Sequence, residues 1–236
     1  MKQELLNYQN NIIRSFGRIK SRKLSINKKK LLEEFLPKIH LNKNFYPEIN
    51  KHKNSQNNIL EIGYGFGDFL FNLAKNNQQK KIYGFEPHIN GVVNLLAMLE
   101  HENLNNIMIS CNDVRLEISN FNDEFFDEIY ILFPDPWPKA KHYKRRLITN
   151  NFIDNILANK IKKSGKITIA TDHDDYKTWI LANILNCQNF VWTAQSKADW
   201  QNFPRDWIFT KYQKKALNEK RSAVLFELLK NTIKHD

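Results

Sequence analysis

The sequence predicts an α/β protein with a doubly wound, mostly parallel sheet and an antiparallel strand at its edge. From Ile59 onward, short apolar runs typical of strands alternate with segments whose apolar residues recur at helical spacing. The run at 126–136, FDEIYILFPDP, contains the continuous apolar stretch of a central parallel strand. Strands that alternate with helices of these lengths favour a single sheet covered by helices.

The predicted elements follow the chain in order. Strands are expected at 58–65, 80–87, 106–113, 126–136, 165–172 and 222–229, the last as the antiparallel edge strand. Helices are expected at 68–77, 89–102, about 145–162 and 174–186. Residues 1–50 are expected to form a basic N-terminal extension, whose amphipathic stretch Leu31–Ile39 packs on the domain formed by residues 51–236.

The composition indicates a folded, basic protein. A hydrophobic content of 42%, with 12% aromatic residues, supports a sizeable core. The excess of 36 Lys and Arg over 25 Asp and Glu gives a formal net charge of +11, which favours a nucleic-acid partner or, less specifically, an anionic membrane. Cys111 and Cys187 have neither metal-ligand nor disulfide-framework spacing, so no metal is expected. No apolar run approaches the roughly 18 residues that span a bilayer, and no secretory segment is evident, so we expect a soluble cytoplasmic protein that does not bind membranes.

A glycine-rich turn predicts a nucleotide-like cofactor. In LEIGYGFGDFL, Gly63, Gly65 and Gly67 allow a tight strand-to-helix turn and close approach of a ligand to the backbone. Glu86 ends the next strand, where a carboxylate accepts hydrogen bonds from both hydroxyls of a ribose. Asp113 follows the third strand and is placed to accept from an adenine amino group. The sequence therefore predicts an adenosine-containing cofactor.

The acidic residues around this turn favour S-adenosylmethionine. Glu61 precedes the glycines, and Asp68 follows them at the expected N-cap of the helix. Two carboxylates repel the pyrophosphate of a dinucleotide, but they suit a cofactor that carries a sulfonium and an ammonium and no phosphate. Methyl transfer is therefore preferred over hydride transfer by a nicotinamide-dependent dehydrogenase.

The stretch LFPDPWPKAKHYKRRL at 132–147 joins an acidic corner to a basic strip. Pro134 and Pro136 fix the backbone on either side of Asp135, at the carboxyl end of a strand where ligands bind. Trp137 is expected either to stack on a nucleic-acid base or to pack as a loop aromatic. Positive charge is unfavourable at a helix N-terminus, so the basic residues that follow, at the expected start of a helix, indicate a phosphate-bearing partner.

Together, the segments EIGYGFGDFL, GFEPHINGVVNLL, FPDPWPKAKHYKRRL, ATDHDDY and TKYQKKAL resemble the bacterial tRNA (guanine-N7-)-methyltransferases, in order from about Phe16 to the C-terminus. The resemblance implies a Rossmann-like class I methyltransferase that transfers a methyl group from S-adenosylmethionine to N7 of a guanine in the tRNA variable loop. It implies that the cofactor contacts are Glu61, Gly63, Glu86, Asp113 and Asp135. Asp135 is also the implied catalytic residue. The implied contacts with substrate and RNA are Lys139, Lys141, His142, Lys144, Arg145, Arg146, Asp172, Thr210, Lys211, Tyr212 and Gln213.

Two positions depart from the family pattern. Gln213 stands where the family has Glu, so a carboxylate that could recognise guanine is replaced by an amide. Lys141 stands where the family has Arg, which removes bidentate geometry toward a phosphate. Guanine N7 carries a lone pair and no proton, so the reaction needs orientation and electrostatics rather than a base. Asp135 or Asp172 is expected to hold the opposite edge of the guanine.

Two other functions stay open at this level. A methyltransferase acting on an exocyclic adenine amine is disfavoured, because the Pro134–Trp137 corner lacks the consecutive prolines of such enzymes. An RNA-binding module on a decayed fold is disfavoured by the intact glycines and acids. The expected partner is tRNA. No obligatory protein partner is expected, and the chain is expected to be a monomer or a homodimer.

Overall fold

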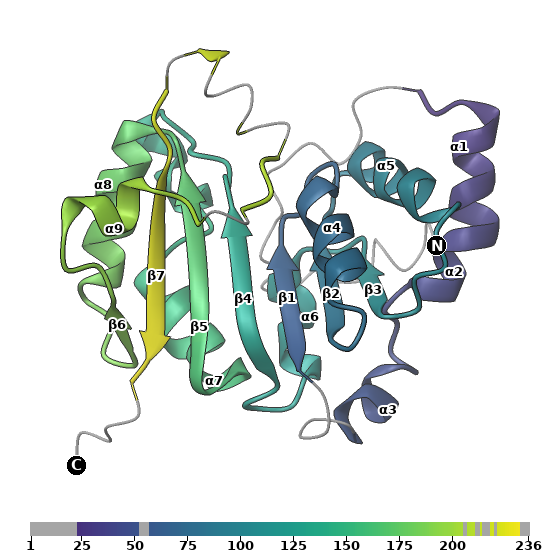
Figure 1. Ribbon diagram of the computed structural model, residues 1–236, viewed down its shortest axis with the longest axis horizontal. Helices are drawn as coiled ribbons and strands as arrows, with labels where there is room; N and C mark the ends of the chain where they lie inside the picture. Colours follow the sequence, from purple (N-terminus) through teal and green to yellow (C-terminus); the bar gives the residue numbers. More distant parts are fainter. Residues whose placement is uncertain are drawn as a thin grey trace.

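The computed structural model describes residues 23–51, 57–204, 207–210, 213, 218–219 and 221–231. Within them the strands form one seven-stranded sheet in the order β3-β2-β1-β4-β5-β7-β6 (Figure 1). The strands from β3 to β5 are parallel, and β7 is antiparallel to both of its neighbours. The strand bounds are β1 Asn58–Ile62, β2 Lys81–Phe85, β3 Ile107–Ser110, β4 Phe126–Leu132, β5 Ile161–Thr171, β6 Phe190–Trp192 and β7 Val224–Lys230. The predicted fold class is confirmed.

The antiparallel strand lies one place in from the edge of the sheet. β7 pairs with β5 through Thr168 and Glu227, as the predicted antiparallel strand should. Its other side pairs with β6, in the register of Val191 with Leu229, so β6 is the outermost strand at that end. β6 covers only Phe190–Trp192, which is too short to show a hydrophobic alternation in the sequence.

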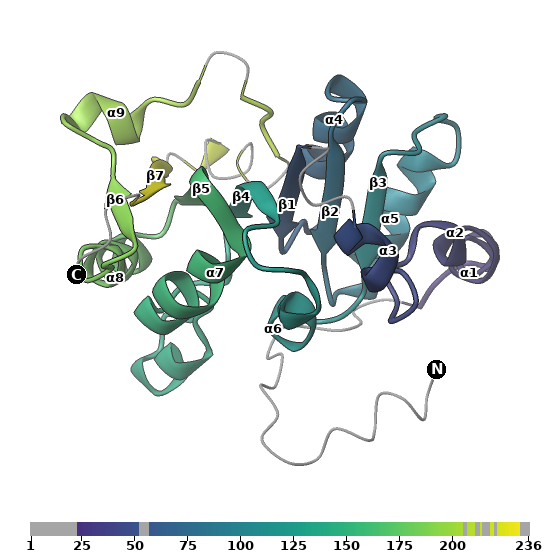
Figure 2. The same cartoon turned by 90° about the horizontal axis from the view of Figure 1, so that it is seen from below.

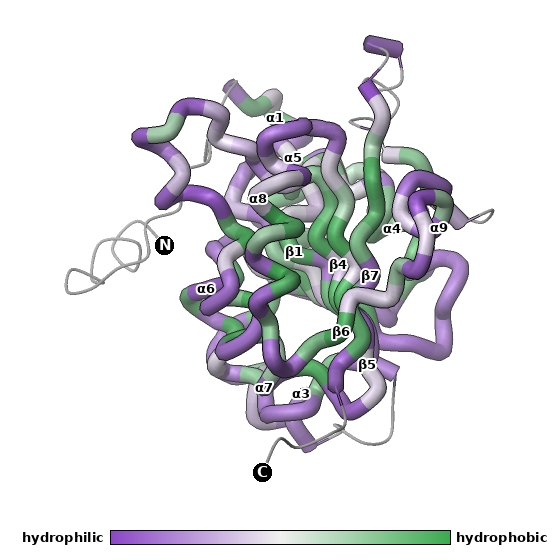
Figure 3. Tube along the Cα trace, turned by 90° about the vertical axis from the view of Figure 1, so that its left-hand side faces the viewer, coloured by the Kyte–Doolittle hydropathy of each residue, from purple (hydrophilic) through white to green (hydrophobic). Residues whose placement is uncertain are grey.

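Helices cover both faces of the sheet. On one face, α4 (Asp68–Asn76) and α5 (Ile89–Leu99) enclose one hydrophobic cluster with β1, β2 and β3. On the other face, α6 (Val114–Glu117), α7 (Ala158–Lys160) and α8 (Asp174–Ile184) enclose the larger cluster. Figure 2 shows α6, α7 and α8 on the side of the sheet opposite α4. Hydrophobic residues follow the strands through the interior, and the outer loops are mainly hydrophilic (Figure 3).

The predicted helix at about 145–162 is wrong at both ends. Residues Ala140–Arg145 form a short 3₁₀ helix, so the basic strip does not lie at the start of the long helix. The helical segment proper runs through Asn151–Leu157 into α7, and the Thr149 hydroxyl accepts from the backbone N–H of Phe152 at 3.1 Å. β5 starts at Ile161 instead of 165 because Ile161 already pairs with Phe126.

The described part of the predicted N-terminal extension adds to the β3 side of the sheet. α1 (Ile26–Lys30) continues through a helical segment, Leu31–Phe35, into α2 (Leu36–Ile39). Leu31 is buried in the cluster that contains α5, as the amphipathic pattern predicts. The chain then pairs along β3, where the N–H of Leu41 donates to the carbonyl of Ile109 at 2.7 Å, and continues into α3 (Tyr46–Lys51). The division of the chain at residue 50 stays a prediction.

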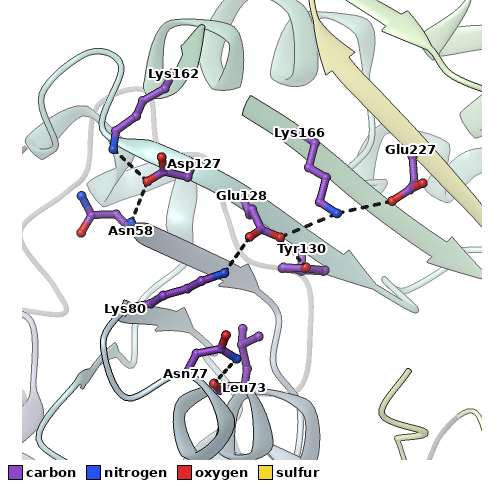
Figure 4. Close-up of polar contacts among 10 residues, drawn as sticks. All are labelled: Asn58, Leu73, Asn77, Lys80, Asp127, Glu128, Tyr130, Lys162, Lys166 and Glu227. Carbon is purple, nitrogen blue, oxygen red and sulfur yellow. Dashed lines mark hydrogen bonds and ion pairs between the residues drawn. The ribbon is translucent and has the colours of Figure 1, made fainter. Parts of the chain in front are cut away.

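Part of the segment between α9 (Lys197–Gln201) and β7 packs against α4. Trp207 packs on Phe69 of α4 and on Phe203, with ring centroids 5.4 and 5.0 Å apart. Further toward the amino ends of the strands, the same face carries a row of charges, Lys80, Glu128, Lys166 and Glu227, each paired with the next (Figure 4). None of these four residues lines the site described next.

Candidate active site

A cavity of about 590 Å³ lies at the carboxyl ends of β1, β2 and β4. The order of the strands reverses between β1 and β4, and in doubly wound sheets ligands bind outside the strand ends at such a point. The lining includes all the residues predicted to contact a cofactor, namely Glu61, Gly63, Glu86, Asp113 and Asp135. The structure therefore brings together side chains that are spread over more than seventy residues of sequence.

The glycine-rich turn takes the backbone conformation that the sequence predicts. Gly63, Gly65 and Gly67 all have positive φ angles, of 75°, 55° and 84°. Gly67 holds the N-cap position of α4 without a side-chain cap. The prediction that Asp68 caps the helix is therefore wrong, because Asp68 is the first helical residue and its side chain lines the cavity instead.

Glu61 is a buried carboxyl group that faces the cavity. The residue is 2% exposed, and its Oε2 atom has no hydrogen-bond partner among the described residues. Burial, and then the charges of Glu86 and Asp68, raise the pKa of Glu61 well above its usual range. A positively charged ligand group in the cavity would satisfy this carboxylate, whereas a phosphate would be repelled.

Glu86 is held by two backbone N–H groups at the end of β2. Its Oε2 accepts from Gly65 at 2.8 Å and its Oε1 accepts from His88 at 2.7 Å. Burial raises the pKa of Glu86 to about 7, although both of these hydrogen bonds favour the ionised form. Each oxygen keeps a further lone pair, so the carboxylate can still accept from a pair of ligand hydroxyls.

Asp113 caps α6 and is clamped by Arg115. Its Oδ1 accepts from the backbone N–H of Arg115 at 3.0 Å and from the Nε of the same residue at 2.9 Å. The Nη2 of Arg115 donates to Oδ2 at 2.6 Å, which makes the ion pair bidentate. Sequence reasoning did not predict a role for Arg115, since a single basic residue two positions after an acid carries no recognisable motif.

The Asp135 corner is a strained loop at the mouth of the cavity. Phe133 and Trp137, on either side of the Pro134–Pro136 segment, have φ angles of 52° and 43°, which bulky residues rarely adopt. Asp135 has an exposed surface toward the cavity, and the surrounding walls still desolvate its carboxyl group enough to raise its pKa. Trp137 lines the cavity, and its ring centroid lies 5.0 Å from the guanidinium carbon of Arg145; that it stacks on a base stays a prediction.

The basic strip divides into exposed and buried members. Lys139, Lys141 and Lys144 are exposed, and His142 and Arg145 are half-buried beside Trp137. Desolvation, and then the positive charges of Arg145, Lys141 and Lys139, lower the pKa of His142. Arg146 departs from the prediction. It is 3% exposed, so its guanidinium is covered and does not join the others on the surface as a phosphate contact.

The remaining predicted substrate residues lie in three different settings. Thr210 lines the cavity. The Asp172 carboxylate is outside the lining and is paired with Arg221. Gln213 is 1% exposed, and its side chain is bonded to Trp207, so it does not face the cavity. Lys211 and Tyr212 lie outside the described residues.

Two absences bear on the site. Among the residues that the structure describes, no group of three or more His, Cys, Asp or Glu side chains is arranged to hold a metal ion. In the same part of the chain, no helix is long and apolar enough to cross a membrane.

Comparison with known proteins identifies the family. The family model described as "Putative methyltransferase" matches residues 55–226. A tRNA (guanine-N(7)-)-methyltransferase of Wolbachia pipientis wMel is 38% identical over 198 residues, which cover 84% of this chain and 86% of that protein. The protein of the same name from Caulobacter vibrioides (strain NA1000 / CB15N) is 34% identical over 207 residues, with coverages of 88% and 91%.

Solved structures agree on the fold. The 16S rRNA methyltransferase KamB matches with a TM-score of 0.53 at 8% identity, over 81% of this chain and 94% of that one. The aminoglycoside resistance methyltransferase NpmB1 matches with a TM-score of 0.52 at 13% identity, over 79% and 93%. The sequence relatives, which are similar along nearly their whole length, carry the assignment further: this chain belongs to the tRNA (guanine-N(7)-)-methyltransferase family.

Proposed function

We propose that the protein transfers a methyl group from S-adenosylmethionine to N7 of a guanine in the variable loop of tRNA, forming 7-methylguanosine. The observation that carries the proposal is one cavity in which Glu61, Glu86, Asp113 and Asp135 meet at the switch point of the sheet, next to an exposed basic strip. The family named by its sequence relatives performs a reaction that needs both parts.

The cavity fits the proposed methyl donor in charge and in hydrogen bonding. Glu61 presents a buried acceptor oxygen with no partner in the described part of the chain, which suits the ammonium or the sulfonium of the donor. Glu86 suits the ribose hydroxyls, and Asp113 suits the adenine amino group. When bound, S-adenosylmethionine supplies an electrophilic methyl group on a positively charged sulfur. The residues of the chain bind and orient it, and their carboxylates disfavour a phosphate group in its place.

Asp135 is the residue that we propose to act on the guanine. N7 is unprotonated, so no side chain has to remove a proton from the attacking atom. A carboxylate at the mouth of the cavity can accept from the N1–H and the N2 amino group, which turns N7 toward the interior. The same negative charge stabilises the positive charge that develops on the base during transfer. Trp137, in the same wall, offers an aromatic face for stacking.

The exposed lysines of the strip are proposed to hold the tRNA backbone. Lys141 and Lys144 lie in the short 3₁₀ helix that follows the Asp135 corner, and Lys139 directly precedes it. Backbone contacts of this kind position the RNA without reading its sequence, and they make binding weaken steeply with salt. We propose that the enzyme acts on tRNA in the cytoplasm and needs no protein partner for catalysis.

The test is a methylation assay with labelled S-adenosylmethionine and unmodified tRNA, followed by digestion and mass spectrometry of the nucleosides. We expect the label in 7-methylguanosine from the variable loop, and Asp135→Ala should abolish most of it while tRNA binding is retained. Label in a methylated adenosine would overturn the proposed substrate. Binding of tRNA without binding of the cofactor would show a binding module instead of an enzyme.

A further inference from the structure

Arg146 is a buried cation in an aromatic cage. Its guanidinium carbon lies 3.7 Å from the ring centroid of Tyr143, 4.9 Å from that of Trp179 and 5.1 Å from that of Tyr176. Planar guanidinium groups stack favourably on aromatic faces, which a lysine ammonium does less well. Its three aromatic contacts come from the 3₁₀ helix and from α8, so the cage joins two separate elements.

The walls of the cage are fixed by hydrogen bonds. The indole of Trp179 donates to the carbonyl of Ile148 at 2.6 Å, and the Tyr176 hydroxyl accepts from the N–H of Ile148 at 3.3 Å. Both bonds anchor α8 to the chain just beyond Arg146. The position of the guanidinium is therefore set by packing on a rigid helix and not by its own flexible stem.

The guanidinium holds the loop that carries Asp135. The Nε of Arg146 donates to the carbonyl of Pro136 at 2.8 Å, one residue after Asp135. That loop has unfavourable positive φ angles at Phe133 and Trp137, and such a conformation persists only where the surroundings enforce it. The bond to Pro136 is a constraint of this kind.

Neither phosphate binding nor core packing explains why the cation of Arg146 is buried where it is. A phosphate ligand should be exposed, yet this residue is 3% exposed and does not line the cavity. A residue retained only for packing should be apolar, because burying a cation is unfavourable and the Nη2 atom has no hydrogen-bond partner among the described residues. The hydrogen bond from its Nε to the Pro136 carbonyl is a third role, which needs a side chain that is both buried and a donor.

We propose that Arg146 is a positioning residue that acts through Asp135. By holding the Pro136 carbonyl it fixes the strained corner, so that the Asp135 carboxylate stays in the place where it orients the guanine. The assignment rests on the proposed function for the role of Asp135. It separates Arg146 from the neighbouring strip residues, which are proposed to bind phosphate.

The test compares Arg146→Lys, which keeps the charge, and Arg146→Met, which removes it, with two variants that each remove a charge at another position. Lys144→Met removes an exposed cation of the strip, and Lys163→Met removes an exposed cation at the start of β5, away from the cavity. For each variant we would measure kcat at saturating tRNA, the Kd for tRNA over a salt series, and the stoichiometry of S-adenosylmethionine binding.

Both Arg146 variants should lose about 100-fold in kcat, since small displacements of a positioned group have effects of this size. Their tRNA Kd, salt slope and cofactor stoichiometry should match the wild type. Lys144→Met should weaken tRNA binding and reduce the salt slope by about one, and Lys163→Met should leave both binding and kcat unchanged. In the Asp135→Ala background, Arg146→Lys should have no further effect on kcat.

Three results would overturn the proposal. A weakened tRNA Kd with a reduced salt slope in Arg146→Lys would make the residue a phosphate ligand. A loss of kcat in proportion to the fraction of protein that still binds cofactor would make it an ordinary packing residue. An unchanged kcat would show that the corner does not need it.

The rate of hydrogen exchange in the peptide that covers residues 133–139 is a readout that does not depend on enzymatic activity. It should speed up in Arg146→Lys and stay unchanged in Lys163→Met. If the wild type forms no 7-methylguanosine, the proposed function fails. The exchange rates then still decide whether Arg146 holds the corner, and unchanged rates would overturn the inference by themselves.

Discussion

The indole Nε1 of Trp207 donates a hydrogen bond of 2.8 Å to the side-chain oxygen of Gln213. Gln213 also donates from its backbone N–H to the hydroxyl of Thr210, at 3.1 Å, and Thr210 lines the cavity. Trp207 in turn packs on Phe69, near the start of α4. The amide that replaces the family Glu therefore anchors the segment beside the cofactor cavity. Gln213 itself is buried and is not among the residues that line the cavity.

Restoring the carboxylate should destabilise the protein in a pH-dependent way. At 1% exposure, the Gln213→Glu side chain can accept from Trp207, but it must stay protonated or bear a buried charge. Its folded-state pKa should be raised, so the loss of stability should be absent near pH 4 and should grow as the pH rises above the unfolded value of about 4.3. We expect about 1–3 kcal/mol at pH 8. Denaturant unfolding at pH 4 and pH 8 measures it, and a loss that is equal at both would contradict the argument.

Cofactor affinity should depend on the ionisation of Glu86. The folded-state pKa is about 7, above the ordinary 4.5, so the unliganded protein holds a proton on Glu86 below neutrality. Because the folded-state pKa of Glu86 is raised, the free energy of unfolding of the unliganded protein should also fall as the pH rises from 4.5 to 7. Because the ionised form accepts the ribose hydroxyls, binding should tighten as the pH rises toward 7 and then level off.

Isothermal titration between pH 5.5 and pH 8.5 checks this dependence. Binding below pH 7 should release a proton, which buffers of different ionisation enthalpy detect. Glu86→Gln is the matched control, because it keeps the shape and removes the titration, and its affinity should be lower and flatter with pH. A wild-type profile with the same shape as that of the control would assign the titration to another group.

Arg115 should contribute to cofactor binding without touching the RNA. Its bidentate pair with Asp113 fixes both carboxylate oxygens at the rim of the cavity. Arg115→Met should therefore weaken S-adenosylmethionine binding roughly 10- to 100-fold, in line with the roughly 1.5–3 kcal/mol typical of a charged hydrogen bond. The Kd for tRNA should be unchanged. Arg115→Lys keeps the charge but loses the bidentate geometry, so it should recover only part of the affinity. Full affinity in Arg115→Met would show that Asp113 is already fixed by capping α6.

The acidic residues at the strand ends could be predicted as site residues, because each stands next to a recognisable apolar run in the sequence. Glu61, Glu86, Asp113 and Asp135 follow or end apolar runs, and parallel strands place their carboxyl ends at one edge. That rule predicts the cavity from sequence without any knowledge of contacts between distant residues.

The contacts made by the basic strip, and those made by Trp207 and Gln213, were not predictable. Within KHYKRR the letters do not show that Arg146 turns inward, because the distinction depends on Tyr176 and Trp179 of α8. The bond between Trp207 and Gln213 likewise depends on how these two residues pack beside α4. Such contacts arise from tertiary packing, which has no period in the sequence.

Gly91 should prove essential for the packing of α5 against the cofactor turn. A Cβ atom at Gly91 would lie 2.1 Å from the carbonyl oxygen of Gly65, a backbone atom that cannot swing aside as a side chain does. In a helix, Gly→Ala ordinarily stabilises by about 1 kcal/mol. Here the clash should reverse the sign, with Gly91→Ala losing about 1–3 kcal/mol of stability and weakening the binding of S-adenosylmethionine.

Gly63→Ala separates this clash from backbone strain. A Cβ atom there would meet no described residue within 4 Å, but the φ of 75° disfavours any side chain. It should lose about 1 kcal/mol, because the left-handed conformation brings the Cβ of an L-residue close to its own backbone, with no clash against another segment. Denaturant unfolding compares the two variants, and cofactor titration shows whether the Gly65 carbonyl has moved. A Gly91→Ala protein as stable as the wild type would mean that α5 can shift away from the turn, and unchanged cofactor affinity in that variant would mean that the turn holds its shape without α5.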